Sequence, residues 1–470
     1  MKFLEAFANI FRVPDLRKRL FFTLALLAVY RLGGHVPTPG TNTTAWQQFM
    51  NSSSGSLFSF FDMFSGGNIR RLTIFALGIM PYITASIILQ LLTVVVPTLE
   101  KLQKEGELGR RKITQWTRYL TIILAVIQSI TIAYGLMSMR EGIVINPGFG
   151  FVVLTVISLT AGTTFIMWLG EQISERGVGN GMSLIIFTGI VVGLPAAINN
   201  VYQNTFVTRE WSPLTLIILI ALMIAVVAFI VLVERGERRI PVQYAKRVVG
   251  RRVMGGQSTH MPLKVNAGGV IPVIFASSIL AFPTTLLQMQ AVKNIHWLEA
   301  TLMSIRHGEP MYYVLFVAGI IFFCFFYISI IFNPNEAADN MRKYGGFIPG
   351  IRPGRNTADY MNQILTKITV VGGIYLAILC LIPDIMISGI KLNHLALIGN
   401  WMDTTLTTLH ARWLLDGMGV TFYFGGTSLL IVVGVAMDTI NQIEAQLIMR
   451  HYEGFTPRSG RIRGRRSSTF

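Results

Sequence analysis

The apolar segments of this 470-residue chain contain two repeated patterns whose matched residues include isoleucine and no charged residue. The pattern GIMPYITASIIL begins at Gly78 and agrees in seven of twelve positions with GVIPVIFASSIL, which begins at Gly269. The pattern GMSLIIFTG begins at Gly181 and agrees in five of nine positions with GTSLLIVVG, which begins at Gly426. Isoleucine recurs at equivalent positions of both pairs: Ile83 with Ile274, and Ile186 with Ile431.

The chemistry that these four isoleucines offer is the exclusion of water. A constriction lined by aliphatic side chains dewets and closes, without a strong preference for any one solute. An ion-coupled transporter normally needs ionisable groups inside the membrane, and the segments that carry the repeats hold almost none. The pattern favours a pore for a chemically varied cargo. A secondary transporter, which a repeat alone allows, and ordinary packing of apolar helices stay open as alternatives.

Motifs for catalysis or metal binding do not occur. The sequence holds no HExxH, GxSxG or Walker pattern, and RGVGNG, which ends at Gly181, does not follow a strand of a βαβ unit. His260 is isolated, and Cys324 and Cys380 fall in apolar runs where packing is the expected role. We therefore expect no enzyme activity, no metal site and no cofactor.

The elements that position these residues are membrane helices. Only 13% of the residues are charged and 52% are hydrophobic, whereas soluble chains carry about 25% charged residues. The composition predicts an all-α membrane protein with ten transmembrane helices. The first is the weakest, because Arg31 lies near its end, and no small-residue cleavage site marks it as a signal peptide. The ten cores lie near Leu20–Val36, Leu72–Val96, Tyr119–Leu136, Phe149–Leu169, Met182–Ile198, Leu214–Val233, Val265–Leu287, Met311–Phe332, Ile368–Ile387 and Phe422–Met437.

The distribution of positive charge predicts the orientation. With the N-terminus inside, inner segments hold 30 of the 40 Lys and Arg residues and outer loops hold 7. The excess places both termini in the cytoplasm. Helices two and seven then cross in opposite directions, as do five and ten, so the chain divides into two inverted five-helix halves, residues 1–210 and 211–470. In such folds the working site lies between the halves, near the midplane.

Long motifs identify the chain as similar to the SecY family, the central subunits of the bacterial protein-conducting channel. They are MFSGGNIRRLTIFALGIMPYITASIILQLLTVVVPTLEKLQKEGELGRRKI from Met63, WLGEQISERGVGNGMSLIIF from Trp168, QSTHMPLKVNAGGVIPVIFASS from Gln257, FNPNEAADNM with GGFIPGIRPG from Phe332 to Gly354, and FYFGGTSLL from Phe422. The resemblance implies a channel without catalysis that translocates unfolded secretory polypeptides. It also implies release of membrane helices through a lateral gate between helices two and seven.

A short apolar segment, SLFSFFDMFSGG from Ser56 to Gly67, precedes the second predicted helix. As a helix it would be about 18 Å long, too short to cross a hydrocarbon core of roughly 30 Å. The resemblance implies that residues 56–70 form a plug, a half-helix folded into the outer funnel; an interfacial helix is the alternative. The implied plug residues are Leu57, Phe58, Phe60, Phe61, Met63, Phe64, Gly66 and Gly67.

The resemblance also implies a pore ring and a gate. The ring departs from the family at Met182, where isoleucine is usual, and it consists of Ile79, Ile83, Met182, Ile186, Ile274 and Ile431. The gate residues are Thr84, Ile87, Gln128, Asn180 and Phe282, of which the polar members form a small cluster in the family. Ordinary helix packing and routine interhelical polar contacts are the alternatives for these two sets.

Basic loops at about 234–264 and 333–366 are the implied docking surface for the ribosome, through its RNA phosphates, and for the motor ATPase SecA. The implied residues are Arg238, Arg239, Lys246, Arg247, Arg251, Arg252 and Arg352; topogenic charge alone is the alternative. The family further implies the small subunits SecE and SecG, signal sequences and nascent chains as ligands, and the bacterial inner (plasma) membrane as location. The basic tail resembles a solvated arm, and the outer loop at 388–421 is longer than is usual in the family.

Overall fold

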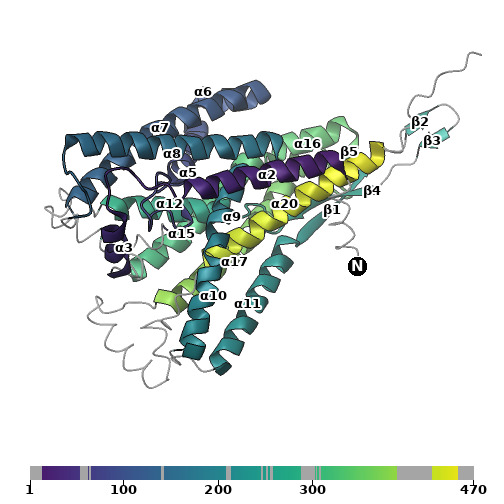
Figure 1. Cartoon of the computed structure of the whole chain (residues 1–470). Helices are drawn as coiled ribbons and strands as arrows, with labels where there is room; N and C mark the ends of the chain where they lie inside the picture. The colour runs from purple at the N-terminus through teal and green to yellow at the C-terminus, as the bar shows by residue number, and fades with distance from the viewer. Residues whose placement is uncertain are drawn as a thin grey trace, which may run out of the picture.

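The computed structural model describes residues 13–52, 62, 65–138, 142–207, 213–244, 247–249, 252–254, 258–286, 302, 304–305, 309–388 and 426–453. Long helices lie beside one another and form most of the molecule (Figure 1). Before residue 210 they are α2 (Pro14–Gly33), α3 (Thr43–Ser52), α5 (Met80–Val95), α6 (Pro97–Lys104), α7 (Glu107–Ser138), α8 (Phe149–Arg176), α9 (Gly181–Val192) and α10 (Leu194–Tyr202), which a π-helical turn, Gln203–Val207, follows. After it they are α11 (Pro213–Glu234), α12 (Ile271–Leu286), α15 (Pro310–Ile331), α16 (Pro334–Lys343), α17 (Arg355–Ser388) and α20 (Gly426–Glu453).

The prediction of a helical membrane protein is confirmed. Among the described residues, six helical segments are long and apolar enough to cross a membrane, or seven if the bent pair α5 and α6 counts as one span. Ile220–Glu234 and Ile271–Leu280 add shorter apolar helices, so this criterion does not reach the predicted ten. The first predicted span, α2, carries charged residues near both ends, which include Asp15 and Arg31.

The second predicted span is shorter than expected. We expected it to begin near Leu72, but α5 begins at Met80, and residues 66–79 form consecutive turns apart from one bridging residue. Between Leu72 and the start of α5 two residues have a left-handed backbone, Leu72 with φ +47° and Gly78 with φ +56°, and this conformation interrupts an α-helix. Pro81 then lies in the first turn of α5, where its missing N–H costs nothing.

The sequence repeat is also a repeat of backbone structure. Gly78 and Gly269 adopt nearly the same left-handed φ, +56° and +58°. The N–H of Gly78 donates to the carbonyl of Phe75 at 2.8 Å, and that of Gly269 donates to the carbonyl of Asn266 at 3.3 Å. Each turn opens a helix of 16 residues with proline in its first turn, α5 and α12. The glycines are needed because a side chain at positive φ is strained.

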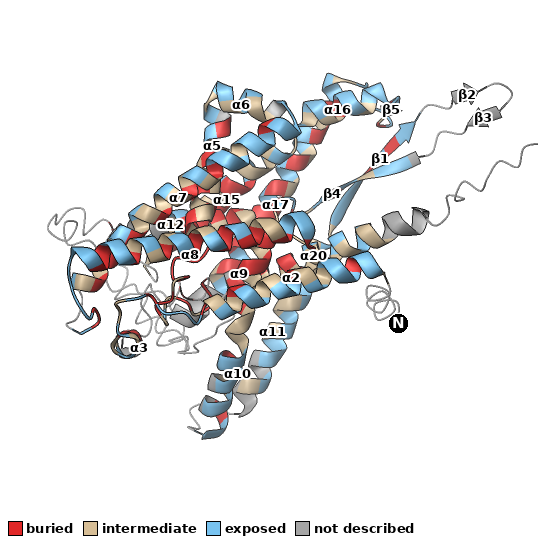
Figure 2. Ribbon diagram, turned by 45° about the horizontal axis from the view of Figure 1, so that its top comes forward, coloured by how far each residue is buried: buried red, intermediate tan, exposed pale blue. Residues whose placement is uncertain are grey.

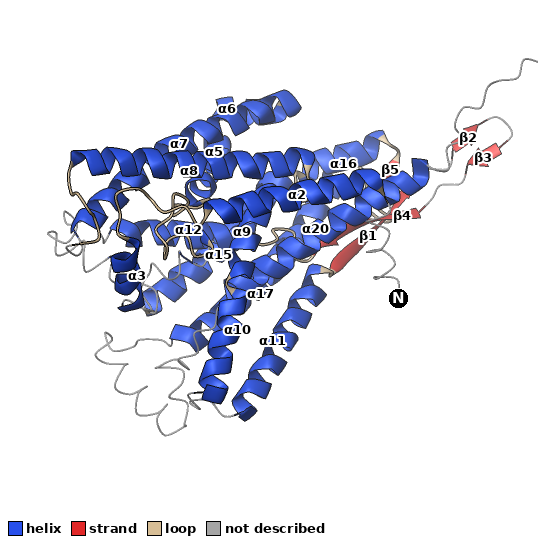
Figure 3. Ribbon diagram, in the orientation of Figure 1, coloured by secondary structure: helices blue, strands red, loops and turns tan. Residues whose placement is uncertain are grey.

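Five strands occur in a part of the chain for which the sequence analysis expected only basic loops. Strand β1 (Glu237–Tyr244) pairs antiparallel with β4 (Ser258–Lys264), and β5 (Gly346–Phe347) pairs with the end of β1. Beyond them, β2 (Arg247–Val249) pairs with β3 (Arg252–Met254), and the hairpin projects from one end of the bundle (Figure 3). Ile240 and Val242 alternate with exposed residues, and Ile240 packs against a cluster that contains Leu263 and Met361.

Candidate functional site

The six predicted ring residues all belong to one hydrophobic cluster in the middle of the bundle, where buried positions gather (Figure 2). They come from the start of α5, from α9, from α12 and from α20, and α5 contacts α12 while α9 contacts α20. Ile79, Ile83, Ile186 and Ile431 are buried, with exposed fractions of 5%, 8%, 4% and 1%, and Met182 and Ile274 are half-buried. All six therefore lie in or against one apolar core, the environment that a seal by exclusion of water requires.

The starts of α9 and α20 determine where Met182, Ile186 and Ile431 lie. Helices α9 and α20 both begin at the matched glycines, Gly181 and Gly426. The side-chain oxygen of Asn180 accepts hydrogen bonds from the N–H groups of Met182 and Ser183, at 3.1 and 3.4 Å, and so caps α9. A Cβ at Gly181 would collide with the carbonyl oxygen of Gly170, so only glycine lets α9 approach α8 this closely.

The predicted polar cluster of the gate is not joined by hydrogen bonds in this structure. The hydroxyl of Thr84 donates to the carbonyl of Met80 in its own helix at 3.0 Å, and Asn180 caps α9. Gln128 is half-buried on α7, and no hydrogen bond connects it with Thr84 or Asn180. Ile87 is 2% exposed within the central cluster, and the side chain of Phe282 lies outside the described part of the chain.

The end of the predicted plug packs directly on α9. Gly66 and Gly67 have φ of +73° and +83°. A Cβ on Gly66 would come within 2.8 Å of the Cα of Gly189, one helical turn after Ile186. Two glycine backbones therefore meet beside the ring. The predicted plug residues Leu57, Phe58, Phe60, Phe61, Met63 and Phe64 lie outside the described residues.

Side chains that the sequence analysis missed hold this segment. The hydroxyl of Tyr30 donates to the carbonyl of Ser65 at 3.1 Å, and Nη1 of Arg31 donates to the carbonyl of Gly66 at 3.1 Å. Nδ2 of Asn68 donates to the same Ser65 carbonyl at 2.6 Å and to the hydroxyl of Tyr30 at 3.3 Å. We call these hydrogen bonds the plug contacts. The position of Arg31 near the end of an apolar run was the signal that could have revealed them.

Asp62 is a buried carboxyl group beside the plug contacts, outside the spanning helices. It is 5% exposed, and its Oδ1 accepts hydrogen bonds from the N–H of Arg70 at 2.8 Å and from the hydroxyl of Ser65 at 3.4 Å. Burial raises its pKa above the usual value, although the hydrogen bond from Arg70 acts in the opposite direction. Buried polar contacts therefore order the last part of the predicted plug segment, residue 62 and residues 65–70.

A second polar contact joins two helices of the same half. Nε of Arg118 on α7 lies 2.7 Å from Oε1 of Glu171 on α8, and the carboxylate is only 15% exposed. Arg111 and Glu107, at 3.5 Å on the surface of α7, form a far more exposed pair. The Arg118–Glu171 pair is a short, charge-assisted hydrogen bond, which is stronger than a hydrogen bond between neutral groups.

Those predicted docking residues that the structure describes lie on the strands and on the turn after β5. Arg238 and Arg239 are exposed on β1, and Nε of Arg239 is 3.8 Å from Oε2 of Glu237. Arg352 is exposed in the turn before α17, and its carbonyl accepts a hydrogen bond from Thr357 at 3.1 Å. Pairing of β1 with β5 joins the two basic loops into one unit. Arg247 and Arg252 are described by backbone alone, and Lys246 and Arg251 lie outside the described residues.

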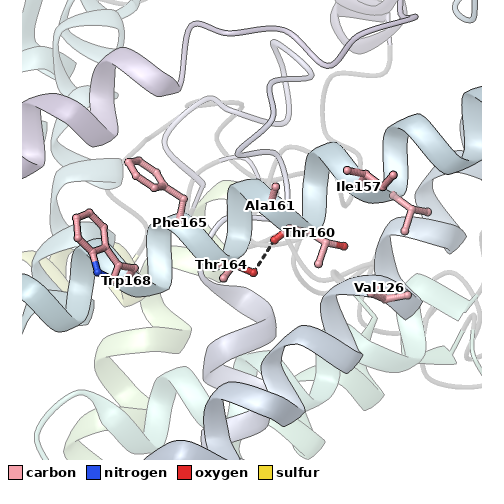
Figure 4. Close-up of a pocket in the computed structure, with 8 residues that line it drawn as sticks. Val126, Ile157, Thr160, Ala161, Thr164, Phe165 and Trp168 are labelled. Carbon is pink, nitrogen blue, oxygen red and sulfur yellow. Dashed lines mark hydrogen bonds between the residues drawn. The ribbon is translucent and has the colours of Figure 1, made fainter.

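An apolar groove lies on the outside of the bundle and is separate from the ring. It runs between α7 and α8 and contains exposed side chains such as Ile157, Phe165 and Trp168 (Figure 4). The hydroxyl of Thr164 is satisfied by the carbonyl of Thr160 in the same helix, at 2.8 Å. Apolar outer surface of this kind suits contact with lipid.

Fold and site together define a polytopic helical membrane protein with an apolar core at its centre. The family model described as SecY matches residues 73–440. The chain is 48% identical over 442 residues to protein translocase subunit SecY of Escherichia coli (strain K12), covering 93% of both chains. It is 47% identical over 463 residues to the corresponding subunit of Streptomyces galbus, covering 96% of this chain and 99% of the relative.

Solved structures show the same fold at low sequence identity. A structure described as that of a protein conducting channel aligns with TM-score 0.60 and 18% identity, over 93% of this chain and 94% of that one. Sec61 in the canine ribosome-channel complex aligns with TM-score 0.57 and 18% identity, over the same shares of both chains. The chain belongs to the SecY family. It is a membrane-embedded protein translocase subunit that forms part of a protein-conducting channel.

Proposed function

We propose that the secretory polypeptide passes through the ring of Ile79, Ile83, Met182, Ile186, Ile274 and Ile431, which the plug closes at rest. Helices α5 and α12 form the lateral gate through which apolar segments leave for the bilayer by their own hydrophobicity. The observation that carries this proposal is the close approach of Gly66 to Gly189, because Gly189 lies one helical turn after Ile186 on α9.

The plug and the ring act in series. The aliphatic cluster excludes water but offers few hydrogen bonds, so a moving chain meets little that would retain it. The plug contacts are polar and directional, and each hydrogen bond contributes about 0.5–1.5 kcal/mol. A seal of this kind holds at rest and yields when a polypeptide competes for the same space.

Partner proteins supply the energy for transport and complete the channel. The chain has no nucleotide-binding motif, so a ribosome or the motor ATPase SecA drives transport, and SecE and SecG complete the channel. The described basic side chains of β1 and of the turn at Arg352 meet ribosomal RNA phosphates or the motor in a salt-sensitive manner. The Sec61 relative is described as part of a ribosome-channel complex. The protein resides in the bacterial inner membrane, with both termini in the cytoplasm.

A crosslinking experiment tests the polypeptide path. A photoreactive residue replaces Ile186, and a secretory protein is stalled halfway through export. A probe at Ile224 on α11, which is 65% exposed, serves as the lipid-facing control. We expect the Ile186 probe alone to capture the stalled chain, and only while the motor or the ribosome is engaged. Equal capture at both positions, or capture at neither, would place the path elsewhere and return the small-solute transporter to consideration.

A further inference from the structure

The turns that open α5 and α12 have the same backbone but different neighbours. Phe75, whose carbonyl receives the N–H of Gly78, stacks on the ring of Tyr30 from α2, with ring centroids 5.9 Å apart. Asn266 occupies the equivalent place before Gly269 and has a polar partner instead. Its Nδ2 donates to Oε1 of Glu234, the last residue of α11, at 2.6 Å.

Both the backbone and the side chain of Asn266 stabilise the turn before α12. Its backbone carbonyl accepts the N–H of Gly269 at 3.3 Å, and its Nδ2 also donates to the carbonyl of Gly269 at 3.2 Å. The residue is 4% exposed, so loss of Glu234 would leave one of its two buried amide N–H groups without an acceptor. The side chain therefore ties the first turn of α12 to the end of α11.

This hydrogen bond lies where the basic hairpin, the segment from β1 to β4, meets the helical bundle. Glu234 lies three residues before the start of β1 and Asn266 two residues after the end of β4, and between them the N–H of Val265 donates to the carbonyl of Gly236 at 2.9 Å. Nζ of Lys264, the last residue of β4, lies 4.0 Å from a carboxylate oxygen on α20. Force applied to the hairpin reaches α12 through these few residues.

We propose that the Asn266–Glu234 hydrogen bond is a positioning contact that holds α12 in its closed place and sets the threshold for opening. This inference rests on the proposed role of α5 and α12 as a gate. In the equivalent place α5 is held by a ring stack, which tolerates small displacements, whereas a hydrogen bond of 2.6 Å is either made or broken. The contact therefore controls how strong a signal sequence must be to open the channel.

The test measures export of one reporter with an intact signal and with a signal interrupted by a charged residue, in cells that carry the full channel. The variants are Asn266→Ala, Glu234→Ala, Glu234→Gln and the double alanine variant. Glu237→Ala is the matched control, because Glu237 lies at the start of the same hairpin and contacts Arg239. The ring variant Ile83→Asn with Ile274→Asn tests the underlying function in parallel.

We expect each alanine variant to raise export of the defective reporter by about 3- to 10-fold, the range that loss of one hydrogen bond implies. The double variant should equal the single ones, because both remove one contact. Glu234→Gln keeps an acceptor oxygen and should stay near wild type, as should Glu237→Ala. If an alanine variant also lowers export of the intact reporter, the ratio of defective to intact export is compared with that of wild type at equal protein level, and an unchanged ratio would overturn the inference.

Four further results would overturn the inference. If export is unchanged in both alanine variants while the ring variant relaxes selectivity, the contact does not set the threshold, and the proposed function stands. Effects that add in the double variant would show that the two residues act separately. Relaxed selectivity in Glu234→Gln equal to that of Glu234→Ala would assign the effect to charge and not to this hydrogen bond. If neither the ring variant nor the alanine variants change selectivity, the gate itself is wrong, and the inference falls with it.

Discussion

Replacement of Gly66 by alanine should release the plug. The added Cβ would lie 2.8 Å from the Cα of Gly189, and because that atom belongs to a helix backbone, no flexible side chain can move aside. Overpacking of this kind costs about 1–3 kcal/mol. The left-handed backbone at φ +73° adds about 1–2 kcal/mol for any residue with a Cβ. The closed state should therefore lose about 2–5 kcal/mol in total.

Gly67→Ala is the matched control for this prediction. Gly67 has φ +83°, so its backbone cost is similar, but nothing lies within 4 Å of an added Cβ. The difference between the two variants isolates the contact with Gly189. It amounts to about 1–3 kcal/mol, or a roughly 5- to 150-fold change in the ratio of closed to open plug.

Ion conductance of resting channels in planar bilayers measures that ratio. We expect Gly66→Ala to leak more than Gly67→Ala, and both to leak more than wild type. Equal leak in the two variants would refute the argument that the Gly66–Gly189 contact holds the plug. Leak at the wild-type level in both would show that the left-handed turn has no part in closure.

Three further predictions concern the ring, the docking surface and the bundle. Ile83→Asn with Ile274→Asn should raise ion leak, because an amide in an apolar constriction costs about 2–7 kcal/mol unless water accompanies it. Arg352→Glu should abolish motor-driven export while the protein still assembles, because the exposed guanidinium would be replaced by a charge of the wrong sign. Glu171→Ala should lower the free energy of unfolding by about 1–3 kcal/mol, seen as a lower midpoint in thermal unfolding, because it leaves a partly buried arginine unpaired.

Each of these predictions has a control on the same chain. Ile224→Asn, on the exposed face of α11, should not leak, and equal leak there would contradict the ring. Arg342 is exposed near the end of α16, and Arg342→Glu should retain export. If Arg342→Glu also blocks export, the effect of Arg352→Glu comes from the net charge of this surface and not from Arg352 itself. Glu107→Ala removes an exposed pair worth at most about 0.5 kcal/mol. A similar loss of unfolding free energy in both glutamate variants would refute the greater strength of the Arg118–Glu171 pair.

The sequence predicted the helical class, the family and the central cluster because these depend on patterns along the chain. Charge-free runs identify membrane helices, and the repeated glycine and proline placed Ile83 and Ile274 at equivalent points of α5 and α12. It failed where a contact joins distant segments. Tyr30 and Ser65 are 35 positions apart, and nothing in the pattern of either segment marks a hydrogen bond between them.

The start of α5 and the strands were missed for local reasons. The apolar run from Leu72 to Val96 satisfies the composition of a span, and only the left-handed turns at Leu72 and Gly78 break it. The alternation of Ile240 and Val242 on β1 covers two residues within a strongly basic segment, so charge dominated the pattern. Strand pairing with β5 across about 100 positions depends on packing that the local sequence does not contain.

The repeat reuses one backbone turn and gives it two kinds of anchor. Before α5 the anchor is aromatic, and its residue Tyr30 also donates to the plug segment, so that closure of the funnel and placement of α5 share a side chain. Before α12 the anchor is the Asn266–Glu234 pair, which stands at the base of the basic hairpin. If the halves are inverted, as the charge distribution predicts, these anchors lie toward opposite faces of the membrane. A partner on one face and a plug on the other could then each release one gate helix, and full opening would need both events.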